Sequence, residues 1–295
     1  MDPVLLLPGD GETISAGDDR YVRIKAAREE IALTESRYEP GESGPGPHVH
    51  RAHADGFWVL DGELTFEVGG ELSRLGAGGF VLIPPNVVHT FRNEGPAAAT
   101  FLNVHAPSMG FDQHLRALHG ARSDEERREA AERFDTFDPP PDGGRPASDA
   151  LLRPPGAGET LSLGPSEVVV KAGREHAGGV LSLTEATLGP GAPGPVPHRH
   201  ETFVDSFYVL DGALTLQLDE RSVEATAGTY ALVPPGAVHT FSNPAEAPAR
   251  FLNLMAPGGL EQYLREVAAA LPPAGAPDPA LMAQIASRYD FVPAV

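Results

Sequence analysis

The chain contains two copies of one sequence pattern, and this repeat constrains the fold more than any other feature. The segment GPGPHVHRAHADGFWVLDGELTF, which starts at Gly44, aligns with GPVPHRHETFVDSFYVLDGALTL, which starts at Gly194. The same offset of 150 carries FLN at 101–103 onto FLN at 251–253. A repeat of this length is as long as a typical domain, so both halves are expected to adopt the same fold.

The length and the sequence between the copies predict two domains. A chain of 295 residues is about twice the commonest domain size. The run DPPPDGGRPASDA at 138–150 is rich in Pro, Gly and Asp, which suits an exposed linker. We therefore predict an N-terminal domain over residues 1–140 and a C-terminal domain over residues 151–295.

Short strands separated by turns dominate each copy. FWVLDGELTFEV at 57–68 and FYVLDGALTLQL at 207–218 predict β-hairpins that turn at Asp-Gly. GGFVLIPPN at 78–86 and GTYALVPPG at 228–236 predict buried strands that end at Pro-Pro, since proline cannot donate to a β-ladder. Strands at this spacing are typical of an all-β fold that is closed or sandwiched.

Each copy is followed by two short segments with helical periodicity. They lie at 111–120 and 123–134 in the first copy, and at 260–271 and 278–289 in the second. Ser123 with Glu126 predicts a capping box, and Asp278 followed by Pro279 predicts an N-cap with proline at the first helical position. The charge run from Asp124 to Arg133 is interpreted as a solvated helix face.

Charge and cysteine content exclude several classes of function. With 22 Lys and Arg against 41 Asp and Glu, the net charge of −19 opposes binding to nucleic acid or to an anionic membrane, and no basic stripe offsets it. The absence of cysteine excludes disulfides, thiolate zinc sites and cysteine nucleophiles. The N-terminal stretch has no basic region and only four consecutive apolar residues, so we expect a cytoplasmic protein.

Six of the eleven histidines occupy matched positions in the two copies. Residues i and i+2 of a strand point to one face, so each His-x-His pair projects both rings together. An Asp follows five residues later, and a third His comes from a later strand. Imidazoles and carboxylates that converge inside a barrel suit a borderline divalent ion. The predicted ligands are His48, His50, Asp55 and His89 in the first copy, and His198, His200, Asp205 and His239 in the second.

A water-facing strand would explain one His-x-His, but not two copies with the acid and the later His in register. The two segments resemble the paired motifs of the cupin superfamily: Gly, His-x-His, an acid and Gly, then Gly-x5-Pro-x-Gly-x2-His-x3-Asn. The first copy reads His48, His50, Asp55, Gly62, Gly78, Pro84, Asn86, His89 and Asn93. The second reads His198, His200, Asp205, Gly212, Gly228, Pro234, Gly236, His239 and Asn243.

The resemblance implies two double-stranded β-helix (jelly-roll) barrels, an arrangement called a bicupin. It also implies a divalent transition metal held by three His and the acid, with Fe, Mn, Ni, Co, Cu or Zn all known in the family, and hence two ions per chain. Two positions depart from the family pattern. The acid is Asp55 or Asp205 where the family usually has Glu, and Asn86 replaces a Gly, although Asn tolerates the same left-handed turn.

Quercetinase-like dioxygenases and oxalate-degrading enzymes are the best-known bicupins, and the residues favour the first of these activities. Oxalate decarboxylases have an Arg three residues before the first His of the motif, but these positions are Pro45 and Pro195 here. No Lys or Arg lies within 38–50 or 188–198, so a small dicarboxylate lacks its counterion. The aromatic residues nearby favour an aromatic, enol or polyketide-like substrate instead.

We therefore expect a quercetinase-like dioxygenase in which the metal holds a deprotonated enol or phenol oxygen. Of the two acids Asp55 and Asp205, at least one would act as general base as well as ligand, and the first copy is preferred for this double role. Two alternatives stay open: a Lewis-acid cyclase or isomerase that needs no O₂, and a small-molecule-binding bicupin that is not an enzyme. The duplication and the charge favour a monomer, with a homodimer as the alternative.

Further residues are candidates for the surroundings of the metal or for the substrate pocket: His53, Phe57, Phe91, Asn103, His105, Phe207, Phe241 and Asn253. Packing of the core is the alternative role for the aromatic residues. The matched position holds Phe203 for His53 and Met255 for His105. His53 is also an alternative ligand in place of Asp55, and His105 is either near the site or exposed at a strand end. His114, His119 and His176 are expected at the surface.

Overall fold

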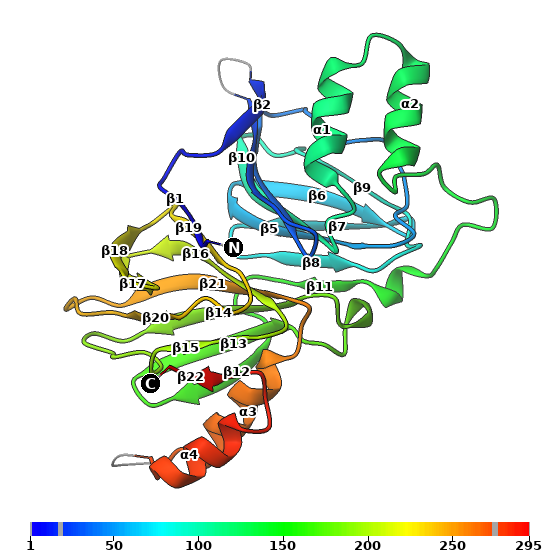
Figure 1. Ribbon diagram of the computed structural model, residues 1–295. Coiled ribbons are helices and arrows are strands. Elements are labelled where there is room, and N and C mark those ends of the chain that lie inside the picture. The colour runs from blue at the N-terminus through cyan, green and yellow to red at the C-terminus, as the bar shows by residue number, and fades with distance from the viewer. Residues whose placement is uncertain (1, 17–19, 273–276, 295) are drawn as a thin grey trace. The chain divides into compact units, whose positions relative to one another are not determined.

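The computed structural model describes residues 2–16, 20–272 and 277–294, and the chain forms two compact units (Figure 1). The N-terminal unit comprises Gly11–Ala157 and Glu175–Val180. The C-terminal unit comprises Met1–Asp10, Gly158–Arg174 and Leu181–Val295. Each unit is a jelly-roll built from two antiparallel sheets, which confirms the all-β fold with two tandem barrels.

The N-terminal unit packs a seven-stranded sheet with the order β11-β8-β5-β10-β4-β3-β2 against a three-stranded sheet with the order β7-β6-β9. The strands are β2 (Glu12–Ala16), β3 (Tyr21–Ala27), β4 (Ala32–Tyr38), β5 (Ala54–Asp61), β6 (Glu63–Val68), β7 (Glu71–Gly76), β8 (Phe80–Ile83), β9 (His89–Arg92), β10 (Ala99–Ala106) and β11 (Leu151–Arg153). Side chains from both sheets form one aromatic-rich core, which includes Phe57, Phe66 and Phe101.

The C-terminal unit repeats this arrangement, with a sheet of order β1-β19-β16-β21-β14-β13-β12 and a second sheet of order β18-β17-β20-β15-β22. The strands are β1 (Val4–Leu6), β12 (Glu159–Leu163), β13 (Ser166–Ala172), β14 (Ser182–Leu188), β15 (His198–Arg199), β16 (Val204–Asp211), β17 (Ala213–Leu218), β18 (Arg221–Thr226), β19 (Tyr230–Val233), β20 (His239–Ser242), β21 (Ala249–Ala256) and β22 (Val292–Pro293). Its core includes Phe207, Leu216 and Phe251.

Two edge strands pair within the unit formed by the other half of the chain. The observed units therefore differ from the predicted boundaries. β1 pairs with β19 in the C-terminal unit, and Leu5 packs against the core there. β11 pairs with β8 in the N-terminal unit, where Leu152 packs against the core. Each short strand covers an edge whose backbone groups would otherwise lack partners.

The two predicted Asp-Gly hairpins are wrong, although the turns themselves are present. β5 pairs with β10 and β8, whereas β6 pairs with β7 and β9, so the chain passes from one sheet to the other between them. β16 and β17 are separated in the same way. Gly62 and Gly212 have φ of +73° and +71°, and an added Cβ at Gly62 would lie 2.4 Å from the Ala98 carbonyl oxygen. A glycine at this corner is therefore required by the change of sheet.

Two helices follow the last long strand of each barrel: α1 (Phe111–Gly120) and α2 (Asp124–Arg133), then α3 (Leu260–Ala270) and α4 (Pro279–Ala286). The Ser123 side chain accepts a hydrogen bond from the Glu126 amide. The Glu126 carboxylate accepts from the Arg122 amide, one residue before the amide that a capping box requires. Asp278 caps α4 as predicted, through the Ala280 amide. None of the described helices combines the length and the apolar character needed to cross a membrane.

Candidate metal centre

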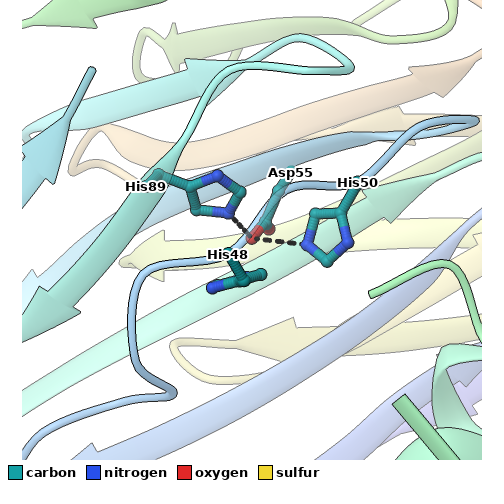
Figure 2. Close-up of side chains that lie close together, drawn as sticks. All are labelled: His48, His50, Asp55 and His89. Carbon is teal, nitrogen blue, oxygen red and sulfur yellow. Dashed lines mark hydrogen bonds and ion pairs between the residues drawn. The ribbon is translucent and has the colours of Figure 1, made fainter. Parts of the chain in front are cut away.

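Three histidines and one aspartate of the N-terminal unit converge in the interior of the barrel (Figure 2). His48 and His50 precede β5, Asp55 lies near its start, and His89 opens β9. The backbone of His48 pairs with that of His89 through two hydrogen bonds of 3.0 Å, which brings the two segments together. One nitrogen or oxygen atom from each of the four side chains lies within 4.8 Å of the others, and all four side chains are buried.

Backbone carbonyls determine which ring nitrogen of each histidine faces the site. His48 Nδ1 lies 2.9 Å from the Gly46 carbonyl oxygen, and His89 Nδ1 lies 3.0 Å from that of Val87. His50 Nδ1 lies 2.8 Å from the carbonyl oxygen of Asp135. A carbonyl can only accept, so each Nδ1 carries the proton and each Nε2 keeps a lone pair. This is the ring state that a metal-binding histidine needs.

Two acceptors then face each other across the site. His89 Nε2 lies 3.2 Å from Asp55 Oδ2, and His50 Nε2 lies 3.7 Å from the same oxygen. His50 Nε2 is buried and has no hydrogen-bond partner among the described residues. Lone pairs that point at a buried carboxylate oxygen are unfavourable unless a cation or a proton lies between them. The donor set therefore fits a divalent transition metal with nitrogen and oxygen ligands.

Electrostatics keep these groups in the states that a metal requires. Burial, followed by the neighbouring His89 and His50, lowers the pKa of His48 well below its usual value, so the ring is neutral at pH 7. Burial alone would raise the pKa of Asp55, but His105, His50 and His89 outweigh it and hold that pKa well below its usual value. Asp55 is therefore an ionised carboxylate beside the neutral ring of His48.

The C-terminal unit contains the matching group. Atoms of His198, His200 and His239 lie within 4.8 Å of one another. Asp205 Oδ2 lies 3.2 Å from His239 Nε2 and 3.6 Å from His200 Nε2. The Nδ1 atoms again face carbonyl oxygens, those of Val196, Asp290 and Ala237. Burial lowers the pKa of His198 to about 3, so this ring too is neutral at pH 7.

Asn103 and Asn253 position the two carboxylates. Asn103 Nδ2 donates to Asp55 Oδ1 and to the Gly56 carbonyl oxygen, and Asn253 does the same for Asp205 and Ser206. One oxygen of each carboxylate is thereby occupied. The other oxygen, Oδ2, is left facing the histidines, and both asparagines lie beside the candidate site.

The two sites differ in the wall behind the carboxylate. In the N-terminal unit, His105 Nε2 lies 3.0 Å from Asn103 Oδ1, and its Nδ1 lies 2.7 Å from His53 Nε2. His53 Nδ1 in turn lies 2.8 Å from Asp135 Oδ2. This chain of buried groups, Asn103–His105–His53–Asp135, is called the histidine chain below. His53 also belongs to a second group of histidines whose nitrogens lie within 4.8 Å of one another, with His50 and His105. Both ring nitrogens of His53 face other members of the histidine chain, which favours Asp55 as the ligand.

The ends of the histidine chain determine how many protons it holds. The Asn103 nitrogen donates to Asp55, so the Asn103 oxygen that faces His105 can only accept, and the Asp135 carboxylate at the other end can also only accept. Both outer ring nitrogens must then donate, and a third proton lies between the two rings. Burial lowers the pKa of His105 well below its usual value, and the Asp135 carboxylate faces His53 at the other end of the histidine chain.

The C-terminal unit has an apolar wall at the same place. Phe203 stacks on His200 with ring centroids 4.1 Å apart, and it forms a cluster with Met255 and Leu260. A charged, hydrogen-bonded wall in one unit thus corresponds to an apolar wall in the other. The sequence showed these two substitutions, but not that their side chains meet behind the site.

The histidines outside the two sets of candidate ligands differ in their exposure. His105 is buried, not exposed, and Phe111 of α1 stacks on it at 3.5 Å. His114 is also buried, against the prediction, because α1 packs this side chain inward. His119 is exposed as expected, and His176 is partly exposed.

The aromatic candidates divide between the two roles considered for them. Phe57 and Phe207 are almost fully buried in the cores of their units. Phe91 and Phe241 line the cavities beside the two sites, as do Asn103 and Asn253. Phe91 also belongs to the buried core of its unit, so one inward-facing strand position can serve both the core and the cavity.

Sequence reasoning missed Asp135 and Asp290, which fasten the His-x-His segments. The Asp135 carboxylate accepts from the Arg51 and Ala52 amides, and the Asp290 carboxylate accepts from the two amides at positions 201 and 202. A signal was present: Arg-Phe-Asp at 133–135 matches Arg-Tyr-Asp at 288–290. This match lies at an offset of 155, so the main register of 150 concealed it.

A cavity opens beside each site. The N-terminal cavity has a volume of about 530 Å³, and its lining includes Tyr38, His48, Asp55, Phe101 and Thr136. The C-terminal cavity has a volume of about 310 Å³, with a lining that includes His198, Asp205, Tyr263 and Phe291. The first volume is well within the range of small-molecule sites, and the second is at its lower limit.

Two jelly-roll units, each with the same His, His, Asp and His turned into its barrel, define the chain as a two-domain cupin, or bicupin. A model of the Cupin domain matches residues 34–105 and again residues 184–255. The chain is 25% identical over 290 residues to a quercetin 2,3-dioxygenase of Bacillus subtilis, covering 89% of this chain and 85% of that protein.

Solved structures share the fold. The Escherichia coli protein Ylba superposes with a TM-score of 0.62 at 13% identity, covering 86% of this chain and 90% of that one. A variant of oxalate decarboxylase from Bacillus subtilis superposes with a TM-score of 0.58 at 17% identity, covering 86% and 77%. These similarities place the chain among bicupins and support a metal-dependent cupin enzyme.

Proposed function

We propose that the protein is a quercetinase-like dioxygenase that acts on an aromatic, enol or polyketide-like small molecule in its N-terminal unit. The observation that carries the proposal is the pair of facing acceptors, His89 Nε2 and Asp55 Oδ2, 3.2 Å apart beside the larger cavity. The 25% identity to a quercetin 2,3-dioxygenase supports the same class of reaction.

The volume and lining of the N-terminal cavity suit an aromatic, mostly apolar ligand with one acidic hydroxyl. Tyr38, Phe91 and Phe101 form an aromatic wall with ring centroids 5.2 to 5.7 Å apart. The three rings and the candidate ligands His48 and Asp55 line the same cavity. A ligand that packs its ring on this wall can therefore turn a hydroxyl toward the candidate ligands.

The residues divide the work of proton transfer. A divalent ion held by the three histidines and Asp55 would supply a Lewis acid that lowers the pKa of an enol or phenol hydroxyl. Asp55 Oδ2 accepts the released proton, because Asn103 occupies Oδ1 and leaves Oδ2 facing the site. Phe111 stacks on His105 and thereby shields the histidine chain from water.

Oxygen consumption tests the proposal. The protein is loaded separately with Fe, Mn, Ni, Co, Cu or Zn, and each form is mixed with quercetin and with a panel of other flavonols and enols. A dioxygenase consumes one O₂ per molecule of substrate converted with at least one of these metals. Conversion at an unchanged rate without oxygen would instead indicate a Lewis-acid cyclase or isomerase. Tight binding without conversion of any compound would indicate a binding protein.

A further inference from the structure

The two metal sites differ in the residue that covers the first histidine of the motif. In the C-terminal unit the Phe291 ring stacks on His198, with centroids 4.1 Å apart and planes at 15°. Phe291 also stacks on Tyr263 of α3, with centroids 4.8 Å apart and planes at 21°. The Phe291 side chain lines the C-terminal cavity and is nearly buried. An aromatic ring therefore lies directly against one candidate metal ligand.

The matched position in the N-terminal unit is Thr136. Asp135 and Asp290 both accept a hydrogen bond from the second histidine of the motif through their carbonyl oxygens. Two residues further on, Phe137 pairs with Val49 and Val292 pairs with Arg199, again at matched places. The backbone follows the same course in both units, so the difference lies in the side chain, a threonine against a phenylalanine.

Phe291 is held in place from both sides. The Asp290 carboxylate accepts from the Glu201 and Thr202 amides at 2.7 and 2.8 Å. Beyond it, β22 pairs with β15, and the Ala294 amide donates to the Pro197 carbonyl oxygen at 2.8 Å. A ring with fixed neighbours on each side and two stacked partners cannot leave the cavity without breaking these contacts. These contacts place the Phe291 ring in the wall of the C-terminal cavity.

The cavity is smaller in the unit with the larger side chain, with a volume of about 530 Å³ beside Thr136 and about 310 Å³ beside Phe291. We propose that the residue at this position sets the size of the molecule that reaches each metal site. Thr136 admits a fused-ring aromatic to the N-terminal site, and Phe291 restricts the C-terminal site to smaller ligands. Only the identification of the larger ligand as the substrate rests on the proposed function.

Ligand binding to one site at a time tests this proposal. His239→Ala leaves only the N-terminal site, and His89→Ala leaves only the C-terminal site. Each protein is loaded with Cu²⁺ and titrated with azide as the small probe and with quercetin as the large probe. Changes in the electron paramagnetic resonance spectrum of the copper report binding, so no turnover is needed. The exchanges Thr136→Phe and Phe291→Thr are then made in the protein that retains the corresponding site.

Azide should bind both sites, and its affinity should change less than about threefold on either exchange. Quercetin should bind the N-terminal site at least tenfold more tightly than the C-terminal site. Thr136→Phe should weaken quercetin binding at least tenfold, and Phe291→Thr should strengthen it by a similar factor. Equal quercetin affinities at the two original sites, or exchanges that leave their ratio unchanged, would overturn the proposal.

Two controls keep the result interpretable. Thermal unfolding and copper content are measured for every variant, and Phe291→Leu provides a smaller apolar side chain if Phe291→Thr does not fold. A parallel change in azide and quercetin affinity would also overturn the proposal, since it would mean that Phe291 acts on the metal and not on ligand size. If no variant consumes oxygen while the size rule holds, the proposed function fails and this inference stands.

Discussion

At the scale of single residues, the ring nitrogen that faces away from each site is as informative as the nitrogen that faces into it. Six backbone carbonyls hold the six Nδ1 atoms, and this leaves every Nε2 with a lone pair in the barrel interior. The Oδ2 atoms of Asp55 and Asp205 are also acceptors, and they face these lone pairs. An arrangement of this kind is stable only with a cation or a proton in it.

Replacement of Asp55 separates its two assigned roles. Asp55→Asn keeps the shape and can still offer an oxygen, but it cannot accept a proton at neutral pH. We expect a loss of about 10²–10⁴-fold in kcat with most of the metal retained, measured by oxygen uptake and elemental analysis. Asp205→Asn is the matched control and should leave oxygen uptake largely intact. Full recovery of activity in Asp55→Asn with excess metal would contradict the role as a base.

His114 predicts a pH dependence of stability. Burial lowers its pKa to about 4 from the ordinary value of 6.5, so the unfolded chain binds the proton more tightly than the folded one. The neutral ring therefore costs nothing above pH 6.5, and stability falls as the pH drops from 6.5 to about 4. The free energy of unfolding should fall by about 3 kcal/mol over this pH range.

The variant His114→Leu, whose apolar side chain cannot take up a proton, should lose less stability over this range than the original protein. Urea unfolding of the metal-free proteins at pH 7.5 and 4.5 measures the difference for the N-terminal unit. The expected gain at pH 4.5 relative to pH 7.5 is about 2–3 kcal/mol. An identical pH dependence in both proteins would show that His114 does not titrate in this way.

At the scale of secondary-structure elements, the strand pattern and the repeat predicted the barrels, whereas pairing partners could not be read from them. The Asp-Gly corners contain the residues of a hairpin, because a left-handed glycine serves a hairpin and a change of sheet equally well. The short strands β1 and β11 each have three residues, too few for a periodic signal. The candidate ligands were predictable because they repeat, and Phe111 and Thr136 were not because their copies differ.

The pairing of the edge strands predicts which unit is destabilised by a substitution in β1 or β11. The order of the sequence alone would predict the opposite unit in each case. Leu5→Ser should raise amide hydrogen exchange in β19 of the C-terminal unit, since Leu5 packs there. Leu152→Ser should raise exchange in β8 of the N-terminal unit. Loss of one partly buried leucine side chain should cost about 1–2 kcal/mol of local stability. Increased exchange confined to the N-terminal unit in Leu5→Ser would contradict the strand assignment.

At the scale of the whole molecule, the duplication provides two centres with the same ligands and different walls. We expect two divalent ions per chain, one in each barrel. His89→Ala and His239→Ala should each remove one ion independently, because the two sites share no ligand. Elemental analysis of carefully loaded protein measures this count. One ion or fewer in the original protein would contradict it.

The assignment of activity to the N-terminal centre is tested most directly by the oxygen uptake of these same two variants. Each is loaded with the metal that gives the highest activity in the original protein and assayed with the substrate found for it. His239→Ala should keep most of the substrate-dependent oxygen uptake, and His89→Ala should reduce it to the background rate. Uptake that survives in His89→Ala and disappears in His239→Ala would contradict the account.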